Sequence, residues 1–107
     1  YDYKARNVAY VVSYTSTIPD PDCRGEYVYA GTLNGEPCYK RLPGTCPIAD
    51  HDQDEYWLWW DSGITAWRIT RLRDDYNLGY WGKVDPITGD YSNSVTYTGT
   101  PNVALAE

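Results

Sequence analysis

The chain of 107 residues contains no phenylalanine and no methionine, and it has a single histidine. Its large apolar side chains are instead 12 tyrosines and 5 tryptophans, which combine an apolar ring system with one polar group. Such residues suit half-buried sheet faces, and the shortage of strong helix formers strengthens this preference. The composition therefore predicts an all-β domain, and the length leaves room for one hydrophobic core.

Positive charge is also scarce, since 15 acidic residues outweigh 9 basic ones and give a formal net charge of −6. An acidic chain is repelled by a phosphate backbone and by an anionic membrane surface, so we expect no nucleic-acid partner. No apolar run approaches the roughly 20 residues that span a bilayer, so we expect no membrane insertion. The chain lacks an initiating methionine and any signal-like segment, which indicates a processed chain or one module of a longer protein.

Alternation of apolar and polar residues, interrupted by turn residues, predicts about seven short strands. They are residues 8–17, 26–33, 37–42, 55–61, 65–72, 80–84 and 91–98. Asn34-Gly35 is the strongest hairpin signal, because both residues accept the positive φ of a type I′ turn. We expect one small antiparallel β-sandwich or open barrel, with a C-terminal tail that begins at Thr100.

The first of these strands stands apart, because two prolines in residues 18–22 separate it from the rest. It forms an arm of residues 1–17 ahead of a β-domain of residues 18–107. Such a strand either packs in its own domain or completes the sheet of a neighbouring subunit. In the second case one face of the strand would fill alternate pockets of the neighbour, and that face consists of Val8, Tyr10, Val12 and Tyr14.

Several aromatic motifs occur together between Asp22 and Thr100. They are Gly25-Glu26-Tyr27, Asn34-Gly35-Glu36-Pro37-Cys38-Tyr39, Tyr56-Trp57-Leu58-Trp59-Trp60-Asp61, Trp67-Arg68-Ile69, Tyr80-Trp81 and Pro86-x-x-Gly89-x-Tyr91. As a set they resemble a Trp/Tyr-rich β-module of large secreted, surface-attached or filament-forming proteins of microbes and their viruses. The resemblance implies a non-enzymatic extracellular module that assembles into fibres, with residues 1–17 supplied to the next subunit. The cysteines and the long segment 43–54 depart from the usual pattern.

The three cysteines, Cys23, Cys38 and Cys46, match no zinc-binding spacing, and only one histidine is present. We expect a disulfide instead, which points to an oxidising extracellular or cell-surface location. Cys38 with Cys46 is the favoured pair, because the loop between them is short. Cys23 with Cys46 is the alternative, and the odd count leaves one further thiol.

An acidic run surrounds the only histidine, His51. Asp50, Asp52 and Asp54 have the first, third and fifth spacing of an EF-hand calcium loop, but Glu55 occupies the sixth place, where the turn needs glycine. This excludes an EF-hand and leaves a looser calcium site as the alternative to a solvated acidic loop. No nucleophile motif accompanies His51, so we expect neither an enzyme nor a cofactor.

Tryptophan rings can stack on the C–H faces of sugars, which suggests carbohydrate binding. We expect Trp57, Trp59 and Trp67 to form the core, which leaves Trp60 and Trp81 as candidate glycan-binding residues. No Asn-x-Ser/Thr triplet is present, so N-glycosylation is not expected. O-linked sugars are a hypothesis for Thr15, Thr17, Thr96, Thr98 and Thr100.

Together these features predict a structural subunit of an extracellular filament or surface appendage. Its partners would be copies of itself, joined head to tail by β-strand addition. The alternative is a carbohydrate-binding or adhesive module that uses surface tryptophans.

Overall fold

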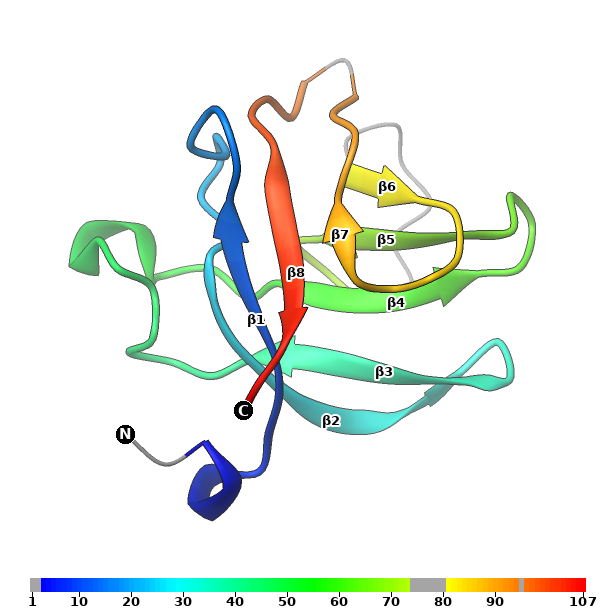
Figure 1. Ribbon diagram of the computed structural model, residues 1–107, viewed down its shortest axis with the longest axis horizontal. Coiled ribbons are helices and arrows are strands. Elements are labelled where there is room, and N and C mark those ends of the chain that lie inside the picture. The colour runs from blue at the N-terminus through cyan, green and yellow to red at the C-terminus, as the bar shows by residue number, and fades with distance from the viewer. Residues whose placement is uncertain (1–2, 74–80, 95) are drawn as a thin grey trace.

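A computed structural model describes residues 3–73, 81–94 and 96–107 of the chain. Within these ranges the backbone forms one sheet of eight antiparallel strands (Figure 1). The strands are β1 (Val8–Tyr14), β2 (Gly25–Leu33), β3 (Glu36–Arg41), β4 (Trp57–Asp61), β5 (Ala66–Thr70), β6 (Trp81–Lys83), β7 (Gly89–Asp90) and β8 (Pro101–Leu105). The helices described are two single turns of 3-10 helix, η1 (Lys4–Arg6) and η2 (Ala49–His51), and neither could cross a membrane.

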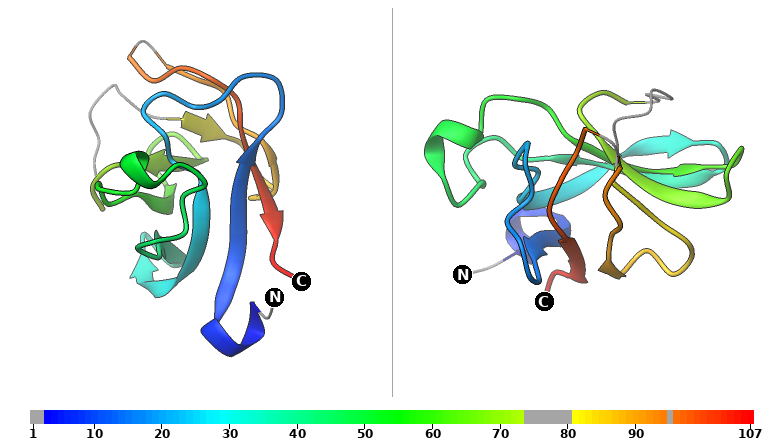
Figure 2. Two further views of the ribbon diagram at one scale, coloured as in Figure 1. Left: turned by 90° about the vertical axis from the view of Figure 1, so that its left-hand side faces the viewer. Right: turned by 90° about the horizontal axis from the view of Figure 1, so that it is seen from above.

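The strand order across the sheet is β6-β5-β4-β3-β2-β1-β8-β7, and its two ends come back together. Gly82 of β6 and Ser92, just after β7, exchange two backbone hydrogen bonds of 3.0 and 2.9 Å. Figure 1 shows β1, β8 and β7 crossing in front of β3, β4 and β5, and Figure 2 shows the same two groups as facing layers. The predicted all-β antiparallel fold is therefore confirmed, and of the two expected forms, a β-sandwich or an open barrel, the sheet has that of a nearly closed barrel.

The long strand β2 curves from one layer into the other (Figure 1). Its pairing with β3 shifts register between Tyr29 and Thr32, where Gly31 has a φ of +114°. A register shift of this kind bends a strand, and glycine adopts the required positive φ at little cost. At the far end of β2, Asn34 and Gly35 have φ values of +55° and +82°, as the predicted type I′ hairpin requires.

The C-terminal part of the sheet differs from the prediction. No described residue from 91 to 98 belongs to a strand, whereas the expected tail contains β8. Pro101 is the first residue of β8, a position that needs no donated hydrogen bond, so the proline does not end the sheet. Val103 lies opposite Val12 of β1 and is 1% exposed, which shows that the tail supplies core residues.

Aromatic side chains with polar tips fill the barrel interior. The buried cluster consists of Val12, Cys23, Tyr27, Tyr56, Leu58, Trp67, Ile69, Trp81, Tyr91 and Val103. The hydroxyl of Tyr27 donates to the Cys23 carbonyl (2.6 Å), and the hydroxyl of Tyr91 donates to the Ile87 carbonyl (2.7 Å). Tyrosine can therefore replace phenylalanine in this core, because these buried hydroxyls each have a hydrogen-bond acceptor.

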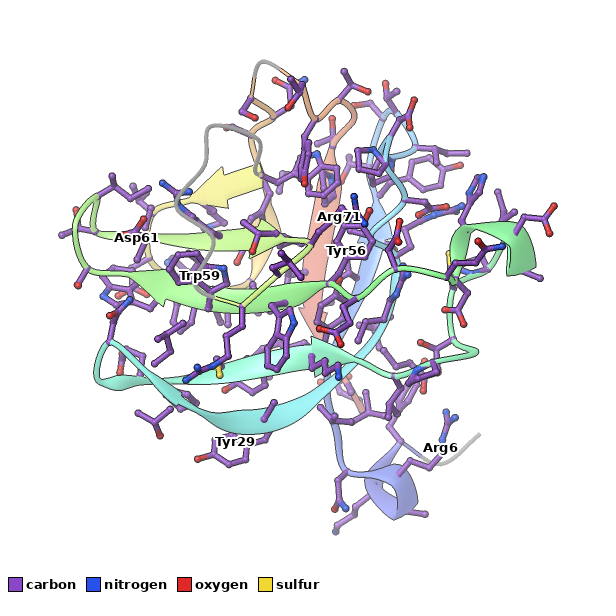
Figure 3. The ribbon with its side chains drawn as sticks, turned by 180° about the vertical axis from the view of Figure 1, so that it is seen from behind. Arg6, Tyr29, Tyr56, Trp59, Asp61 and Arg71 are labelled. Carbon is purple, nitrogen blue, oxygen red and sulfur yellow. The ribbon has the colours of Figure 1, made fainter. Side chains whose placement is uncertain are left out.

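The outer face of β4 and β5 is buried as well. Trp59 is 0% exposed, and its Nε1 donates to Thr70 Oγ1 at 2.9 Å (Figure 3). Beside it, Arg68 and Asp61 form a buried ion pair with 2.8 Å between Nε and Oδ2. The strand β4 is therefore covered on both faces, as its run of tryptophans predicts. Trp57 is the exception, since this outer-face ring is only half-buried.

Candidate functional site

The predicted subunit-joining strand, β1, lies between β2 and β8 of its own chain. Two of its four candidate joining residues face the interior: Val12 is 2% exposed, and the Tyr10 ring packs edge-on against Tyr39 with 4.9 Å between centroids. Val8 is 8% exposed, but a register shift between Val8 and Tyr10 pairs it with Val28 and places it on the opposite face of the sheet, so the prediction that all four residues share one face is wrong. Tyr14 is 42% exposed and contacts the guanidinium of Arg24. Removing β1 would leave unpaired edges on both β2 and β8 and would open the core.

The chain after β1 continues alongside the segment that leads into β8. Four backbone hydrogen bonds of 2.9–3.1 Å join Thr15, Thr17 and Asp20 to Thr98 and Thr100. These contacts extend the pairing of β1 with β8 well beyond the strand itself. The arm and β8 therefore form one long two-stranded ladder, from residues 10 and 105 to residues 20 and 98.

This ladder permits no side chain at Gly99. A Cβ atom there would lie 2.5 Å from the Ile18 carbonyl oxygen and 2.6 Å from Pro19 Cα, and the φ of Gly99 is +87°. Glycine is therefore required both for its backbone angle and for its small size. The close approach seats the residues after β1 against the residues before β8.

Arg41, the last residue of β3, holds the irregular segment 42–56 against the start of β2. The residue is 4% exposed, and its two terminal nitrogens donate to four backbone carbonyls. The acceptors are the carbonyl oxygens of Asp22 (2.8 Å), Arg24 (3.1 Å), His51 (3.1 Å) and Asp54 (2.8 Å). The planar guanidinium suits this task, because it presents five N–H groups in fixed directions.

Arg41 also contacts a carboxylate, an aromatic ring and a glycine. Its Nε lies 3.8 Å from Asp52 Oδ1, and its guanidinium lies over the Tyr56 ring, 4.7 Å from the centroid. A Cβ atom at Gly25 would lie 2.8 Å from both Arg41 Cδ and Thr45 Oγ1. Glycine at this position therefore leaves the space through which the arginine side chain passes.

The buried carboxylate of Asp22 is the second polar centre of this region. Arg24 donates to it through Nε (2.9 Å), Nη2 (2.7 Å) and the backbone N–H (3.1 Å), and His51 Nδ1 lies 2.8 Å from it. Burial would raise the pKa of Asp22, but the hydrogen bonds from Arg24 and His51 outweigh burial and lower it to about 2. The carboxylate therefore stays ionised over the physiological pH range.

The three candidate calcium ligands do not converge. The Asp52 carboxylate accepts hydrogen bonds from the backbone N–H groups of Gly44 and Cys46, and Asp54 Oδ1 is paired with Arg71 at 3.1 Å. Asp50 is exposed in η2. In the described part of the chain, no group of three or more histidine, cysteine or carboxylate side chains is placed to hold a metal ion. Asp52 instead stabilises the loop between β3 and β4, to which it belongs, by accepting hydrogen bonds from that loop's own backbone.

All three cysteines are free in the structure, so neither the predicted Cys38–Cys46 disulfide nor the alternative Cys23–Cys46 disulfide is formed in it. The Cys38–Cys46 pairing is wrong for a further reason, because Cys38 lies on the opposite face of β3 from Arg41. Alternation along β3 places Tyr39 and Arg41 on the face that contains Tyr27, whereas Cys38 points to the opposite face. Cys46 lies with Arg41 and Asp52. The sheet therefore separates Cys38 from Cys46, however short the loop between them.

The two candidate glycan-binding tryptophans differ in position. Trp81 is 0% exposed, and its Nε1 donates to the Thr98 carbonyl at 3.0 Å, so the prediction that it offers a ring to a sugar is wrong. Trp60 is half-buried and packs edge-on against Trp67, with 5.4 Å between ring centroids. Trp60 therefore keeps part of its surface open to a ligand.

Sequence reasoning missed Arg41 and Asp22. A signal was available for Arg41, since period two in the predicted strand 37–42 places it on the same face as Tyr39. A charged residue on an apolar strand face must find buried partners. The partners themselves lie in irregular segments, and no local pattern identifies them.

Comparisons of the chain with protein-family models, with curated proteins and with solved structures found no match.

We expect Arg41→Lys to lower the free energy of unfolding by about 3 kcal/mol, because a lysine ammonium cannot reach four carbonyls and leaves buried acceptors without donors. The matched control is Arg71→Lys, which changes an ion pair whose side chains are 53% and 49% exposed. That change should cost less than about 1 kcal/mol. Urea unfolding of both variants measures the difference, and equal effects would contradict the role assigned to Arg41.

Stability should also depend on the ionisation of Asp22. Its pKa is lowered from 3.8 to about 2 in the folded state, so folding gains about 2 kcal/mol above pH 4 and loses it as the pH falls toward 2. We expect Asp22→Asn to be less stable above pH 4 and to show a flatter profile between pH 4 and 2. Asp50→Asn, which alters an exposed carboxylate, should keep the wild-type profile. Unfolding curves at each pH test this, and parallel profiles for the wild type and Asp22→Asn would rule it out.

Proposed function

We propose that the protein is a structural subunit of an extracellular filament or surface appendage, and that it joins copies of itself by donating β1 to the next subunit. The observation that carries this proposal is the position of β1, which is first in the chain but lies inside the sheet between β2 and β8. A terminal strand in such a place can be supplied by another copy without changing any contact that the strand makes.

The rest of the sheet supports this choice of strand. The strands β2 to β6 follow one another in the chain and in the sheet, so each is held by its connections to its neighbours. The strand β1 is different, because a long irregular segment, residues 15–24, is its link to β2. The side chains of that link are exposed from Thr15 to Ile18, and its backbone pairs with Thr98 and Thr100. Donation would therefore carry this pairing with β1, so that the same hydrogen bonds form with Thr98 and Thr100 of the neighbouring subunit.

The energetics favour exchange at high local concentration. Donation replaces each intramolecular contact of Val8, Tyr10 and Val12 by the same contact between two chains, so the core is unchanged. What differs is the strain of the link and the entropy of association. Because each subunit would donate at one place and accept at another, the contact does not close on itself and produces a filament.

A cysteine pair across β1 and β8 tests the proposal. Val11 and Ala104 lie directly opposite each other, and paired strand residues have Cα atoms about 5.5 Å apart, within disulfide range. We expect a Val11→Cys, Ala104→Cys variant to form a ladder of covalent oligomers on a non-reducing denaturing gel. The control is Val28→Cys with Lys40→Cys, a pair within the β2–β3 hairpin that should give only monomers.

The outcomes of this experiment separate the alternatives. Electron micrographs that show fibres of the Val11→Cys, Ala104→Cys variant, together with a covalent ladder, would support strand donation. Monomers alone on the gel would overturn it, because they mean that β1 stays in its own subunit. Dispersed single particles in every native preparation would overturn the filament itself.

A second candidate function, carbohydrate binding, is favoured by a row of aromatic residues on one sheet face. Strand register places Tyr29, Tyr39 and Leu58 on the same face, with Trp60 two residues further along β4. Tyr29 is 60% exposed and lies near Tyr39, with 6.4 Å between ring centroids, and Figure 3 shows it at the margin of the molecule. Half-exposed flat rings of this kind can stack on the C–H faces of sugars.

If this row binds a glycan, Trp60→Ala and Tyr29→Ala should each weaken retention on an immobilised glycan about tenfold, because each removes a stacking ring. Tyr14→Ala is the control, since Tyr14 is 42% exposed and lies on β1 beside Arg24. A glycan screen with the intact protein measures retention. Absence of any retained glycan, or equal losses in all three variants, would remove this candidate.

A further inference from the structure

Arg41 contacts residues that adjoin Cys23 in sequence and a carboxylate that binds the backbone of Cys46. Arg41 Nη1 donates to the carbonyls of Asp22 (2.8 Å) and Arg24 (3.1 Å), the residues on either side of Cys23. Arg41 Nε lies 3.8 Å from Asp52 Oδ1, and the same oxygen accepts the backbone N–H of Cys46 at 3.2 Å. The neighbours of two cysteines that are 23 positions apart in the chain therefore contact one guanidinium.

The two thiols also share their charged neighbours. Burial raises the pKa of the Cys23 thiol; Asp22 and Cys46 raise it further, and Arg41 opposes them. Burial raises the pKa of Cys46 as well, and Asp22 and Arg41 act on it with the same signs. The same carboxylate, Asp22, and the same guanidinium, Arg41, therefore act on both thiols.

Cys38 is excluded from this pair by the geometry of β3. It is 0% exposed, but it lies on the opposite face of the strand from Arg41. Among the three cysteines, only Cys23 and Cys46 lie on the same side of the sheet as the Asp22–Arg41 cluster.

We propose that Cys23 and Cys46 become joined by an intrachain disulfide when the chain folds in an oxidising compartment. One thiolate attacks a small-molecule disulfide such as oxidised glutathione, which releases one glutathione thiol. The second thiolate then displaces the other glutathione from the mixed disulfide. The two cysteines together lose two protons and two electrons, and the oxidant becomes two thiols.

The timing follows from burial. Thiolate is the reactive form, and burial in the folded chain makes it scarce at both cysteines. The bond therefore forms before the segment 43–55 closes over Cys46. Once formed, it fixes that segment, which contains the short helix η2 and no strand, to the start of β2. This inference does not depend on how subunits join.

Peptide mapping of refolded protein tests the pairing. Trypsin cuts after Arg24, Lys40 and Arg41, so the three cysteines fall on separate peptides, 7–24, 25–40 and 42–68. The full chain is refolded with reduced and oxidised glutathione, denatured, treated with an alkylating reagent, digested and weighed. We expect peptide 7–24 linked to 42–68, and an alkylated cysteine on 25–40. Three alkylated cysteines, or any link to peptide 25–40, would overturn the proposal.

Two variants sharpen the result. Cys38→Ala should keep the link, whereas Cys46→Ala should leave Cys23 alkylated. Adding a reductant should lower the unfolding temperature of the wild type and of Cys38→Ala by roughly 10 °C, because a disulfide restricts the unfolded chain. The same reductant should leave Cys46→Ala unchanged. A reductant effect of equal size in Cys46→Ala would mean that the stabilising bond is a different one.

Discussion

The rest of the structure depends on the hydrogen bonds of the Arg41 guanidinium. The segment between β3 and β4 has one turn of 3-10 helix and no strand, so a sheet ladder cannot satisfy its carbonyl groups. Arg41 supplies donors to two of those carbonyls and to two more from the start of β2. A neutral side chain of similar size would leave the two buried carbonyls of Asp22 and Arg24 unpaired, at a cost of about 1–3 kcal/mol each, and would release the two part-buried carbonyls of His51 and Asp54. One residue therefore sets how the β3–β4 loop approaches β2, and with it the position of Tyr56 at the entry to β4.

The choice of tyrosine and tryptophan over phenylalanine imposes a similar constraint throughout the barrel. A phenylalanine can rotate and shift within a core, but a buried hydroxyl or indole N–H must meet an acceptor. Tyr27, Tyr91 and Trp81 meet theirs on the backbone of Cys23, Ile87 and Thr98, all of which lie outside the strands. Core packing and loop conformation are thus fixed by the same side chains. This coupling explains how a small barrel with long irregular connections keeps one arrangement.

Much of the fold could be predicted, because a strand with one buried face alternates apolar and polar residues along the sequence. The strands from β1 to β6 lie where alternation predicts them, and the Asn34-Gly35 turn has the expected angles. The strand β8 was missed because Thr100-Pro101 is typical of a chain end, and only the partner strand β1 shows that a proline is tolerated there. The candidate functional residues were predicted less accurately than the strands. Cys38 and Cys46 are close in sequence but separated by a sheet, and Trp81 is buried by residues that no local pattern relates to it. Contacts between irregular segments carry no sequence period.

The closure of the barrel bears on how such a subunit could join others. Free strand edges invite uncontrolled pairing between chains, and β6 and β7, which end the sheet, are only three and two residues long and are bridged through Gly82 and Ser92. A subunit with β1 in place therefore offers little edge for addition of a strand from outside. Under the proposed strand donation, joining would proceed by exchange of a strand already in the sheet, and the pairing of β1 with both β2 and β8 would make the acceptor site specific. The ladder between residues 15–20 and 98–100 would add to that specificity. The backbone of Ile18 and Pro19 packs directly against Gly99, where a side chain would not fit. In that proposal, the short bridged edges and the paired position of β1 would together define the geometry in which two subunits fit.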